Sequence, residues 1–411
     1  MTPTPHPRLL AALLAAATLA TGCKKEEAVR ADTDFYKKTQ EQLIRAKPGT
    51  VIELPEGRFQ LDRSLSSSVD GVTIRGKGLD KTILSFKGQT QGAEGLLVTG
   101  NNITIEDLAI EDTKGDALKV NGTDGLVIRR VRTEWTGGPK ATNGAYGLYP
   151  VQCRNVLIED SVAIGASDAG IYVGQSEHVI VRRNKAMRNV AGIESENTKY
   201  ADIYENTVTE NTGGILVFDL PDLPIQGGRF TRVFNNDIYA NNTDNFAPEG
   251  NIVAKVPPGT GMMLLATDHA EIFNNRIRDN KTANLFIVSY FVTQKPINDK
   301  SYDPYSEAVS IHDNTFSGGG DSPSGVALKV MALKLGKPFP DIVYDGIVDD
   351  KKQTPQGTLP DELRLCIRNN GDADFINADL GHDLANVHRE LAPHDCQHPS
   401  YEPVKLTGVI Q

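Results

Sequence analysis

Outside residues 1–22, the sequence has no apolar run long enough to cross a bilayer as a helix, which excludes a polytopic helical membrane protein. It also lacks a phosphate-binding loop, a dinucleotide fingerprint and a nucleophile triad, so no nucleotide partner is expected. Basic residues are too few for nucleic acid: 43 lysines and arginines stand against 53 aspartates and glutamates, for a net charge of −10. The chemistry must therefore be sought elsewhere.

The first 22 residues read as a secretory signal, with Arg8 followed by the apolar run 9–20. The motif Ala20-Thr21-Gly22-Cys23 resembles a bacterial lipobox, which implies that Cys23 is lipidated and anchors the protein to a membrane. Lys24 in place of aspartate favours the outer membrane of a bacterial cell envelope. The alternative is a soluble secreted protein with a stray cysteine.

The other three cysteines fall into two groups. Cys366 and Cys396 lie in one C-terminal segment, and in an oxidising compartment they are expected to form a disulfide. Cys153 stands alone inside the repeat region, where it is expected to pack as a small apolar residue.

A repeat runs through the middle of the chain. Short apolar triplets recur with a base period of 22 or 23 residues and with longer steps where segments are inserted. The triplets begin at Ile103, Leu126, Val156, Val179, Ala201, Thr231, Ala270 and Val309. Helical periodicity is absent from this region, which excludes a helical repeat.

Three further columns accompany the triplets. Asn184, Asn206, Asn236, Asn275 and Asn314 form one column, and Asn189, Asn211, Asn241 and Asn280 form a second. A small residue, usually glycine, precedes a second short strand in each unit: Ala117, Gly147, Gly170, Gly192, Gly214 and Gly261. Asparagine suits sharp corners and can bond from one layer to the next, so we expect stacked coils of short strands, a parallel β-helix.

The start of the repeat supports this fold. The segments "AKPGTVIELPEGRFQL" and "VTIRGKGLDKTIL" resemble the first coils of the pectin-lyase-like right-handed β-helix superfamily, a resemblance that covers roughly residues 47–317. We therefore expect an all-β right-handed solenoid at 47–320, after a signal peptide at 1–22 and a tether with an N-terminal cap helix at 23–46. Residues 321–411 are expected to form an irregular C-terminal cap.

Function is sought in residues that the repeat does not require. In the glycine-preceded strands the middle residue should point away from the interior, which places Lys119, Tyr149, Tyr172 and Glu194 on one outward line about 15 Å long, with Glu196 beside it. Insertions at 135–145, 219–228, 243–260 and 293–306 should wall a groove over this line, suited to an extended polymer. Additional candidates for substrate contact are Trp135, Tyr146, Gln152, Asp168 and Asp219. Asp116 and Asp168 could equally be plain corner residues.

Three chemistries fit these side chains. A uronate lyase or epimerase needs a base, an acid and a cation for the sugar carboxylate, which Tyr149, Tyr172 and Lys119 could supply. Calcium held by Glu194, Glu196 or Asp168 could assist, and the sequence indicates no other cofactor. A glycoside hydrolase needs two carboxylates, and the expected separation of Glu194 and Glu196 falls near that of an inverting pair. A binding protein needs only the face and the loops.

Family motifs separate these alternatives. The Gly-His-Gly of polygalacturonase-like hydrolases is missing. The stretch "YGLYPVQCRNVLIEDSVA" resembles a region of mannuronan epimerases and related lyases: Tyr146, Gly147 and Pro150 match the motif, whereas its Asp, His and Asp are replaced by Tyr149, Val151 and Gln152. The first expectation is therefore a polysaccharide lyase or epimerase with a polysaccharide partner. The alternative is a non-catalytic carbohydrate-binding or structural envelope lipoprotein.

Overall fold

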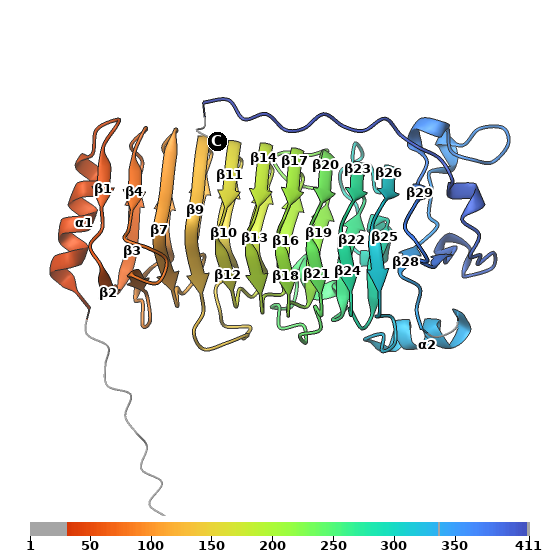
Figure 1. The fold of residues 1–411 in the computed structure, drawn as a ribbon, viewed down its shortest axis with the longest axis horizontal. Helices are drawn as coiled ribbons and strands as arrows, with labels where there is room; N and C mark the ends of the chain where they lie inside the picture. The colour runs from red at the N-terminus through yellow and green to blue at the C-terminus, as the bar shows by residue number, and fades with distance from the viewer. Residues whose placement is uncertain (1–30, 336–337, 409–411) are drawn as a thin grey trace, which may run out of the picture.

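The apolar triplets of the repeat form strands that pair with one another in the predicted register. The computed structural model describes residues 31–335 and 338–408. In it, Ile103 pairs with Leu126, and each later triplet pairs in parallel with the next, through to Ala270 with Val309. The predicted parallel β-helix is thus confirmed, and its coils stack along the long axis in Figure 1.

Within the described residues the strands belong to two long parallel sheets. Sheet A contains β1 (Val51–Glu53), β2 (Gly57–Gln60), β4 (Thr73–Arg75), β5 (Thr82–Ser85), β7 (Ile103–Glu111), β9 (Asp124–Glu134), β11 (Arg154–Glu159), β12 (Val162–Ile164), β14 (Glu177–Arg182), β15 (Lys185–Met187), β17 (Lys199–Tyr204), β18 (Thr207–Thr209), β20 (Arg229–Phe234), β21 (Asp237–Tyr239), β23 (Asp268–Phe273), β24 (Arg276–Arg278), β26 (Glu307–His312), β27 (Thr315–Ser317) and β29 (Cys366–Arg368). Sheet B contains β3 (Arg63–Ser67), β6 (Gln91–Val98), β8 (Leu118–Asn121), β10 (Tyr146–Val151), β13 (Ala169–Gly174), β16 (Ala191–Glu196), β19 (Gly213–Phe218), β22 (Thr260–Leu265), β25 (Ala283–Val288), β28 (Ile342–Tyr344) and β30 (Phe375–Asn377).

Asparagine ladders tie the coils together at two corners. The side-chain amide of Asn184 donates to the side-chain oxygen of Asn206, and the same bond repeats from coil to coil until Asn314 donates to Asn370. The residue before each ladder asparagine, such as Glu205, adopts the left-handed backbone conformation at the corner, and the asparagine itself does not. The ladder asparagines thus serve the stacking of the coils, because their side chains point inward to the neighbouring layers.

The N-terminal end is closed by α1 (Thr33–Arg45), close to the predicted cap helix. Its Gln40 side chain donates to the carbonyl of Ser66 and accepts from the amide of Ser66. The helix therefore satisfies backbone groups of β3 that have no further coil to pair with, as expected for a capped solenoid.

The C-terminal region is more regular than expected. Strands β28, β29 and β30 continue the two sheets past residue 320, where the sequence analysis ended the solenoid. The second α-helix, α2 (Val326–Leu335), lies against the side of sheet B. Short 3-10 helices complete the loops: η1 (Ile252–Lys255), η2 (Tyr290–Thr293), η3 (Asp350–Lys352), η4 (Asp361–Leu363), η5 (Leu380–His382) and η6 (Ala392–His394).

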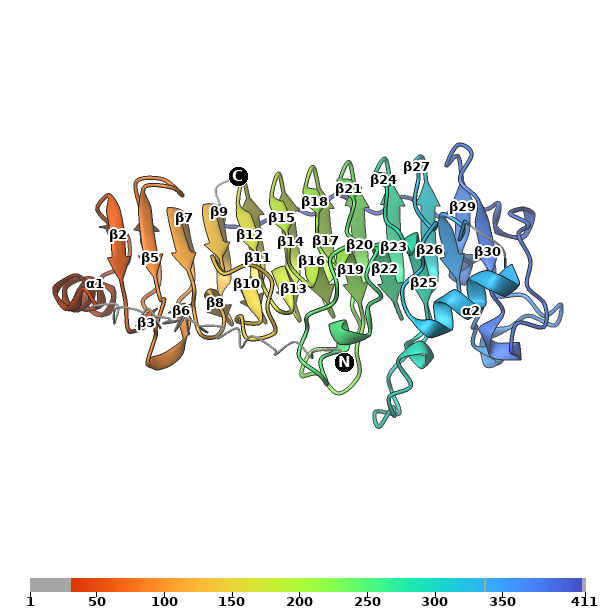
Figure 2. The same ribbon diagram turned by 90° about the horizontal axis from the view of Figure 1, so that it is seen from below.

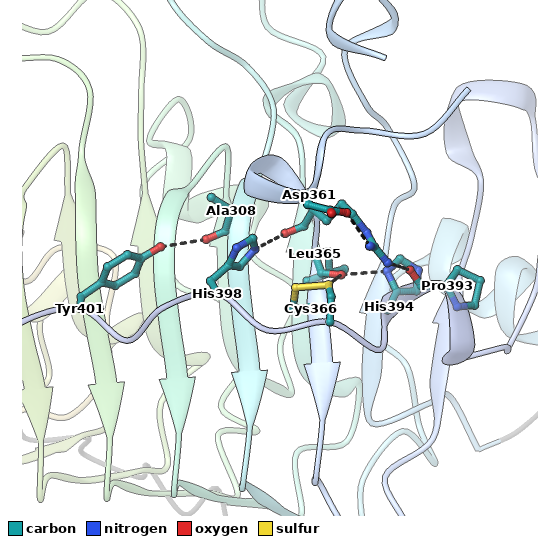
Figure 3. The surroundings of a disulfide bond; sticks show 10 residues. Ala308, Asp361, Leu365, Cys366, Pro393, His394, His398 and Tyr401 are labelled. Atoms are coloured by element: carbon teal, nitrogen blue, oxygen red, sulfur yellow. Dashed lines mark hydrogen bonds and ion pairs between the residues drawn. A yellow bond between two sulfur atoms is a disulfide. The ribbon is translucent and has the colours of Figure 1, made fainter. Parts of the chain in front are cut away.

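A disulfide precedes the last segment of the chain. Cys366 and Cys396 are bonded as predicted, and Cys153 is a buried free cysteine. Beside the disulfide, the ring nitrogen Nδ1 of His394 lies 3.1 Å from the carbonyl oxygen of Leu365 (Figure 3). Residues 399–408, here called the C-terminal strap, then run back along the outside of sheet A (Figure 1).

The strap is attached over several coils. The backbone amide of Val404 donates to Asp202 of β17, and that of Thr407 donates to Asn155 of β11. Val404 and Leu406 also pack against an apolar patch of sheet A formed by Val127, Leu157 and Ile180. No helix in the described part of the chain is long and apolar enough to cross a membrane.

Candidate functional site

The predicted outward line exists on sheet B. Tyr149 pairs with Lys119, Tyr172 pairs with Glu194, and Glu194 pairs with Leu216, so these side chains stack on consecutive coils. Their sequence neighbours, such as Ile171 and Ile193, fill the interior of the solenoid. The alternation of a pleated strand therefore fixes the four candidates on the outer face, as predicted.

Most of this outer face is covered, which corrects the expected open groove. Only 2% of Tyr172, 1% of Glu194 and 8% of Glu196 is exposed. The insertion at 243–260 was expected to form a wall, but its Val253 and Val256 pack with the outward side chains of the ladder. An apolar insertion is stabilised more by burying its side chains against apolar strand positions than by projecting into water. The loop at 243–260 therefore lies over the ladder and is here called the roof.

The N-terminal end of the line remains open. The Nζ atom of Lys119 lies 3.6 Å from Asp116 Oδ2 and 4.0 Å from Glu94 Oε1, and all three side chains are partly exposed. The same ammonium sits 5.1 Å from the centre of the Tyr149 ring. This open patch thus offers a cation, two carboxylates and an aromatic face to a ligand.

Three tyrosines link the open patch to the covered part. The ring of Tyr146 stacks on Tyr149 with centroids 4.3 Å apart and lies 4.8 Å from Tyr172. Tyr149 meets Tyr172 edge to face at 4.9 Å. Burial, first, and the nearby carboxylates, second, raise the pKa of all three phenols, so they keep their protons at neutral pH and serve as donors.

An acidic cluster of Asp168, Glu194 and Glu196 lies beneath the tyrosines. The Tyr172 hydroxyl donates to Glu196 Oε1 at 2.7 Å, and the Tyr146 hydroxyl donates to Asp168 Oδ2 at 3.4 Å. The side-chain amide of Asn251, from the roof, donates to the same Asp168 oxygen at 2.9 Å. Among the described residues, Glu194 Oε2 has no hydrogen-bond partner.

Burial makes this cluster hold protons. Burial and the charge of Glu196 raise the pKa of Asp168 to about 7. Burial and the neighbouring Asp168 raise the pKa of Glu194 well above its ordinary value, and burial raises the pKa of Glu196. Carboxyl groups this close cannot all ionise in an enclosed space, so the cluster can take up or release a proton near neutral pH.

Several predicted contact residues have structural positions instead. Trp135 was expected to contact substrate, but it is buried in the interior core and its indole nitrogen donates to the carbonyl of Thr113 at 2.8 Å. Asp219 is also buried, and its carboxylate accepts from the amide of Gly228, which closes the base of its own insertion. Gln152 is exposed just after β10, and its side-chain amide lies 3.4 Å from the side-chain oxygen of Gln175.

The carboxylates named as possible calcium ligands are not arranged as a metal site. The described residues contain no group of three or more His, Cys, Asp or Glu side chains arranged to hold a metal ion. Two residues of the site were missed by sequence reasoning. Glu94 precedes the regular repeat, and Asn251 lies in an insertion without periodicity, so no column pointed to either of them.

Comparison with known proteins identifies the architecture. The family model described as "Right handed beta helix region" matches residues 66–232 and 192–332. The mannuronan C-5 epimerase AlgE4 A-module of Azotobacter vinelandii is similar in structure with a TM-score of 0.54, at 18% identity over 77% of this chain and 88% of that chain. The AlgE6 A-module of the same organism gives a TM-score of 0.47, at 16% identity over 76% of this chain and 84% of that chain.

A more distant likeness is to an exopolygalacturonase of Thermotoga maritima, with a TM-score of 0.42 at 10% identity over 75% of this chain and 80% of that chain. No curated protein matches the sequence. At these identities the likeness concerns the fold, and the site residues of this chain carry the functional argument.

Proposed function

We propose that this chain, which belongs to the right-handed β-helix family, binds an extended carbohydrate at the open patch of sheet B. We further propose that it removes a proton from the bound sugar, as a polysaccharide lyase or epimerase does, because the open patch is linked to a buried acidic cluster. The observation that carries the proposal is the hydrogen bond from Tyr146 to Asp168. It connects the open patch to a carboxylate whose pKa is about 7.

The proton path is short. A uronate in the open patch would present the C–H next to its carboxylate to the Tyr146 oxygen. As that oxygen takes up the sugar proton, its own proton passes to Asp168, so the phenol stays neutral and Asp168 ends as the acid. Burial, first, and the charge of Glu196, second, raise the pKa of Asp168 to about 7, so its ionised form is a competent proton acceptor near neutral pH.

Lys119 supports a uronate as the substrate. Its ammonium stands at the open end of the line, where it can neutralise the sugar carboxylate as negative charge develops on the ring. Burial raises the pKa of its partner Asp116. After proton removal, a proton delivered from solvent to the opposite face of the sugar gives the epimer, and Asp168 releases the abstracted proton to solvent. In the lyase outcome the 4-O substituent leaves instead, and the proton held by Asp168 neutralises the departing oxygen through the Tyr146 hydroxyl.

The experiment follows both outcomes in parallel. The protein is incubated with mannuronan, alginate and polygalacturonate in D2O, and deuterium at C5 is measured by NMR while absorbance reports any new double bond. Tyr146→Phe keeps the ring stack but loses the hydroxyl, so turnover should fall by at least about a hundredfold. Tyr200→Phe, on an exposed stack on sheet A, is the matched control. Full activity in Tyr146→Phe would refute this path.

A second function is favoured by the roof. Since Tyr172, Glu194 and Glu196 are covered, the open patch around Lys119 and Tyr149 would also serve a protein that binds carbohydrate without turning it over. Affinity electrophoresis in gels that contain each polymer distinguishes the two: retardation that Tyr149→Ala abolishes, with no deuterium uptake and no double bond in the wild type, identifies the binding function.

The place of action is part of the proposal. The motif Ala20-Thr21-Gly22-Cys23 supports lipid anchoring through Cys23, with Lys24 favouring the outer membrane of a bacterial cell envelope. These residues lie outside the part of the chain that the structure describes. An anchored enzyme or binding protein would meet polysaccharides of the envelope where they are assembled or modified.

A further inference from the structure

The outer face of sheet B changes character halfway along the rod. After Glu194, the next residues in the same register are Leu216, Met263, Phe286 and Val343. These four positions offer a polar ligand no charged group and no side-chain hydrogen bond, because all four side chains are apolar. The face therefore divides into a polar half near β10 and an apolar half from β19 to β28.

Three segments cover the apolar half without closing it. The loop that carries η1, the segment that carries η2, and α2 all project from the same side of the solenoid (Figure 2). Between them and the strands lies a cavity of about 610 Å³, lined mainly by apolar side chains such as Met263, Phe286 and Met331. This volume is in the range of pockets that hold small ligands, roughly 300–1,000 Å³.

The two charged residues that line the cavity differ in burial and in hydrogen bonding. Asp345 is buried, and both its oxygens are occupied by hydrogen bonds from Ser289 and Ile347. The side chain of Lys255 is exposed at the cavity, and its ammonium has no ion pair or hydrogen bond with the described residues. The charge that remains available to a ligand is therefore positive.

Two of the segments that border the cavity, α2 and η2, carry a concentration of exposed apolar residues. Five of the ten large apolar side chains that are exposed in the described chain lie on α2 and η2: Val326, Val330, Leu333, Phe291 and Val292. Val326 and Leu333 are 80% and 79% exposed, and their spacing with Val330 places all three on one stripe of the helix. The opposite side of α2 packs into the molecule through Ala332.

Basic residues flank the stripe. Lys329 and Lys334 are exposed on α2, which contains no acidic residue, although the whole chain has a net charge of −10. A helix with an apolar stripe bordered by lysines is suited to the interface of a membrane that carries anionic lipids. A neutral apolar partner would need the stripe but would gain nothing from Lys255, Lys329 and Lys334.

We propose that α2 and η2 form a membrane-contact surface that rests on an anionic lipid bilayer, with the cavity behind it open to a lipid acyl chain. Val330 and Leu333 would enter the interface, and Lys255, Lys329 and Lys334 would meet the headgroups. The surface acts independently of any lipid on Cys23 and of the chemistry at Tyr146. It would hold the C-terminal half of the rod on a membrane.

The test uses the full chain with Cys23→Ser, which cannot be acylated at that position. It is sedimented with phosphatidylcholine vesicles and with vesicles that also contain phosphatidylglycerol. Binding to the anionic vesicles, weakened by salt, is expected. Val330→Ser with Leu333→Ser should weaken binding about tenfold, and Lys329→Ala with Lys334→Ala should remove the preference for anionic lipid. Ile44→Ser, at an exposed apolar residue of α1, is the matched control.

A local readout separates this surface from others. Val326→Cys, labelled with an environment-sensitive fluorophore, should shift to the blue on anionic vesicles, and quenching by brominated acyl chains should place the label within the lipid. Circular dichroism and thermal melting establish that each variant is folded. The proposal is overturned if the Cys23→Ser chain stays in solution with both vesicle types, if the double serine variant binds as the parent does, or if only a soluble fatty acid or another protein occupies the surface.

Discussion

The side-chain amide of Asn251 donates a hydrogen bond of 2.9 Å to the carboxylate of Asp168, across 83 positions of sequence. This bond joins the roof of the outer face to the acidic cluster beneath it. We expect Asn251→Ala to lower the free energy of unfolding by about 1 kcal/mol, because a buried carboxylate loses one donor. It should also raise the pKa of Asp168 further, since the donor stabilises the ionised form.

Thermal melting and limited proteolysis of the loop at 243–260 measure this effect. Glu249→Ala, an exposed residue of the same loop, is the control and should leave both unchanged. If the roof restricts access to the site, Asn251→Ala will also increase ligand binding. Equal proteolysis rates in the two variants would show that the bond does not hold the roof.

The stability of the protein should depend on the protonation of Asp168. Its folded pKa is about 7, against an ordinary value of 3.8, so between these pH values the unfolded chain ionises while the folded chain keeps its proton. Folding then loses stability as pH rises through this window and regains it as pH falls. Asp168→Asn removes this contribution and should raise the melting temperature at pH 8 more than at pH 4.

Asp107 provides a control with the opposite sign. The hydrogen bond from Arg130 lowers the pKa of Asp107, so this group stabilises the fold at neutral pH and loses its effect as pH falls through the lowered pKa. Asp107→Asn should therefore lower the melting temperature at pH 8. Identical pH profiles for the wild type and Asp168→Asn would contradict the raised pKa.

The asparagine ladder should carry stability without carrying function. Asn206 donates to the carbonyl of Val181 and to Asn236, and its oxygen accepts from the backbone and side-chain amides of Asn184. Asn206→Ala leaves several of these buried groups without partners, at a cost of about 2 to 4 kcal/mol in chemical denaturation. Asn298→Ala, at an exposed loop position, is the control. Ligand binding by the folded fraction should be retained.

The disulfide between Cys366 and Cys396 should stabilise the C-terminal region. Replacing both by serine is expected to cost about 2 to 4 kcal/mol and to expose the strap to carboxypeptidase. Alkylation in denaturant without a reductant should modify Cys153 and spare the bonded pair. If the serine variant keeps the wild-type denaturation midpoint, the strap is held by its contacts to sheet A alone.

Anchoring can be tested by fractionation. Cys23→Ser should release the protein from the outer membrane or block processing of the signal, because a thioether-linked lipid requires the cysteine sulfur. If the membrane-contact surface at α2 also operates, the released protein will remain partly on anionic vesicles and leave them at high salt. Labelling with radioactive palmitate that persists in Cys23→Ser would contradict the assignment of the anchor.

The fold could be predicted because the two-residue alternation of a strand and the 22-residue repeat together fix which side chains point into the solenoid and which point out. Once Ile171 and Ile193 are placed inside, Tyr172 and Glu194 must lie outside, and the pairing confirms this. The final coils escaped prediction for a related reason. Asn370 follows Asn314 by 56 positions, beyond the 22 to 39 that separate the other ladder residues, so it could not be recognised as the next rung.

The environment of the site could not be predicted from spacing. An insertion can stand beside a strand ladder or fold over it, depending on which residues its apolar side chains contact. Here Val253 and Val256 contact side chains on the outer face of sheet B, so the insertion folds over the ladder. Trp135 was misplaced because it begins an insertion, yet its ring turns into the interior. The column of Glu194 predicts an outward side chain, but it does not predict the burial that raises the pKa of this residue.

The length of the C-terminal strap matches the number of coils that it crosses. From Tyr401, whose amide bonds to Glu271 on β23, to Thr407, bonded to Asn155 on β11, it crosses four coil steps, about 19 Å at 4.8 Å per step. Six residues of extended chain at about 3.3 Å each cover about 20 Å, so the strap is already taut. A coil added or lost between β11 and β23 would move every attachment point by 4.8 Å, roughly one and a half strap residues. The number of coils between β11 and β23 and the length of the strap can therefore change only together. The strap thus fixes the length of this part of the solenoid, although the repeat itself sets no limit on the number of coils.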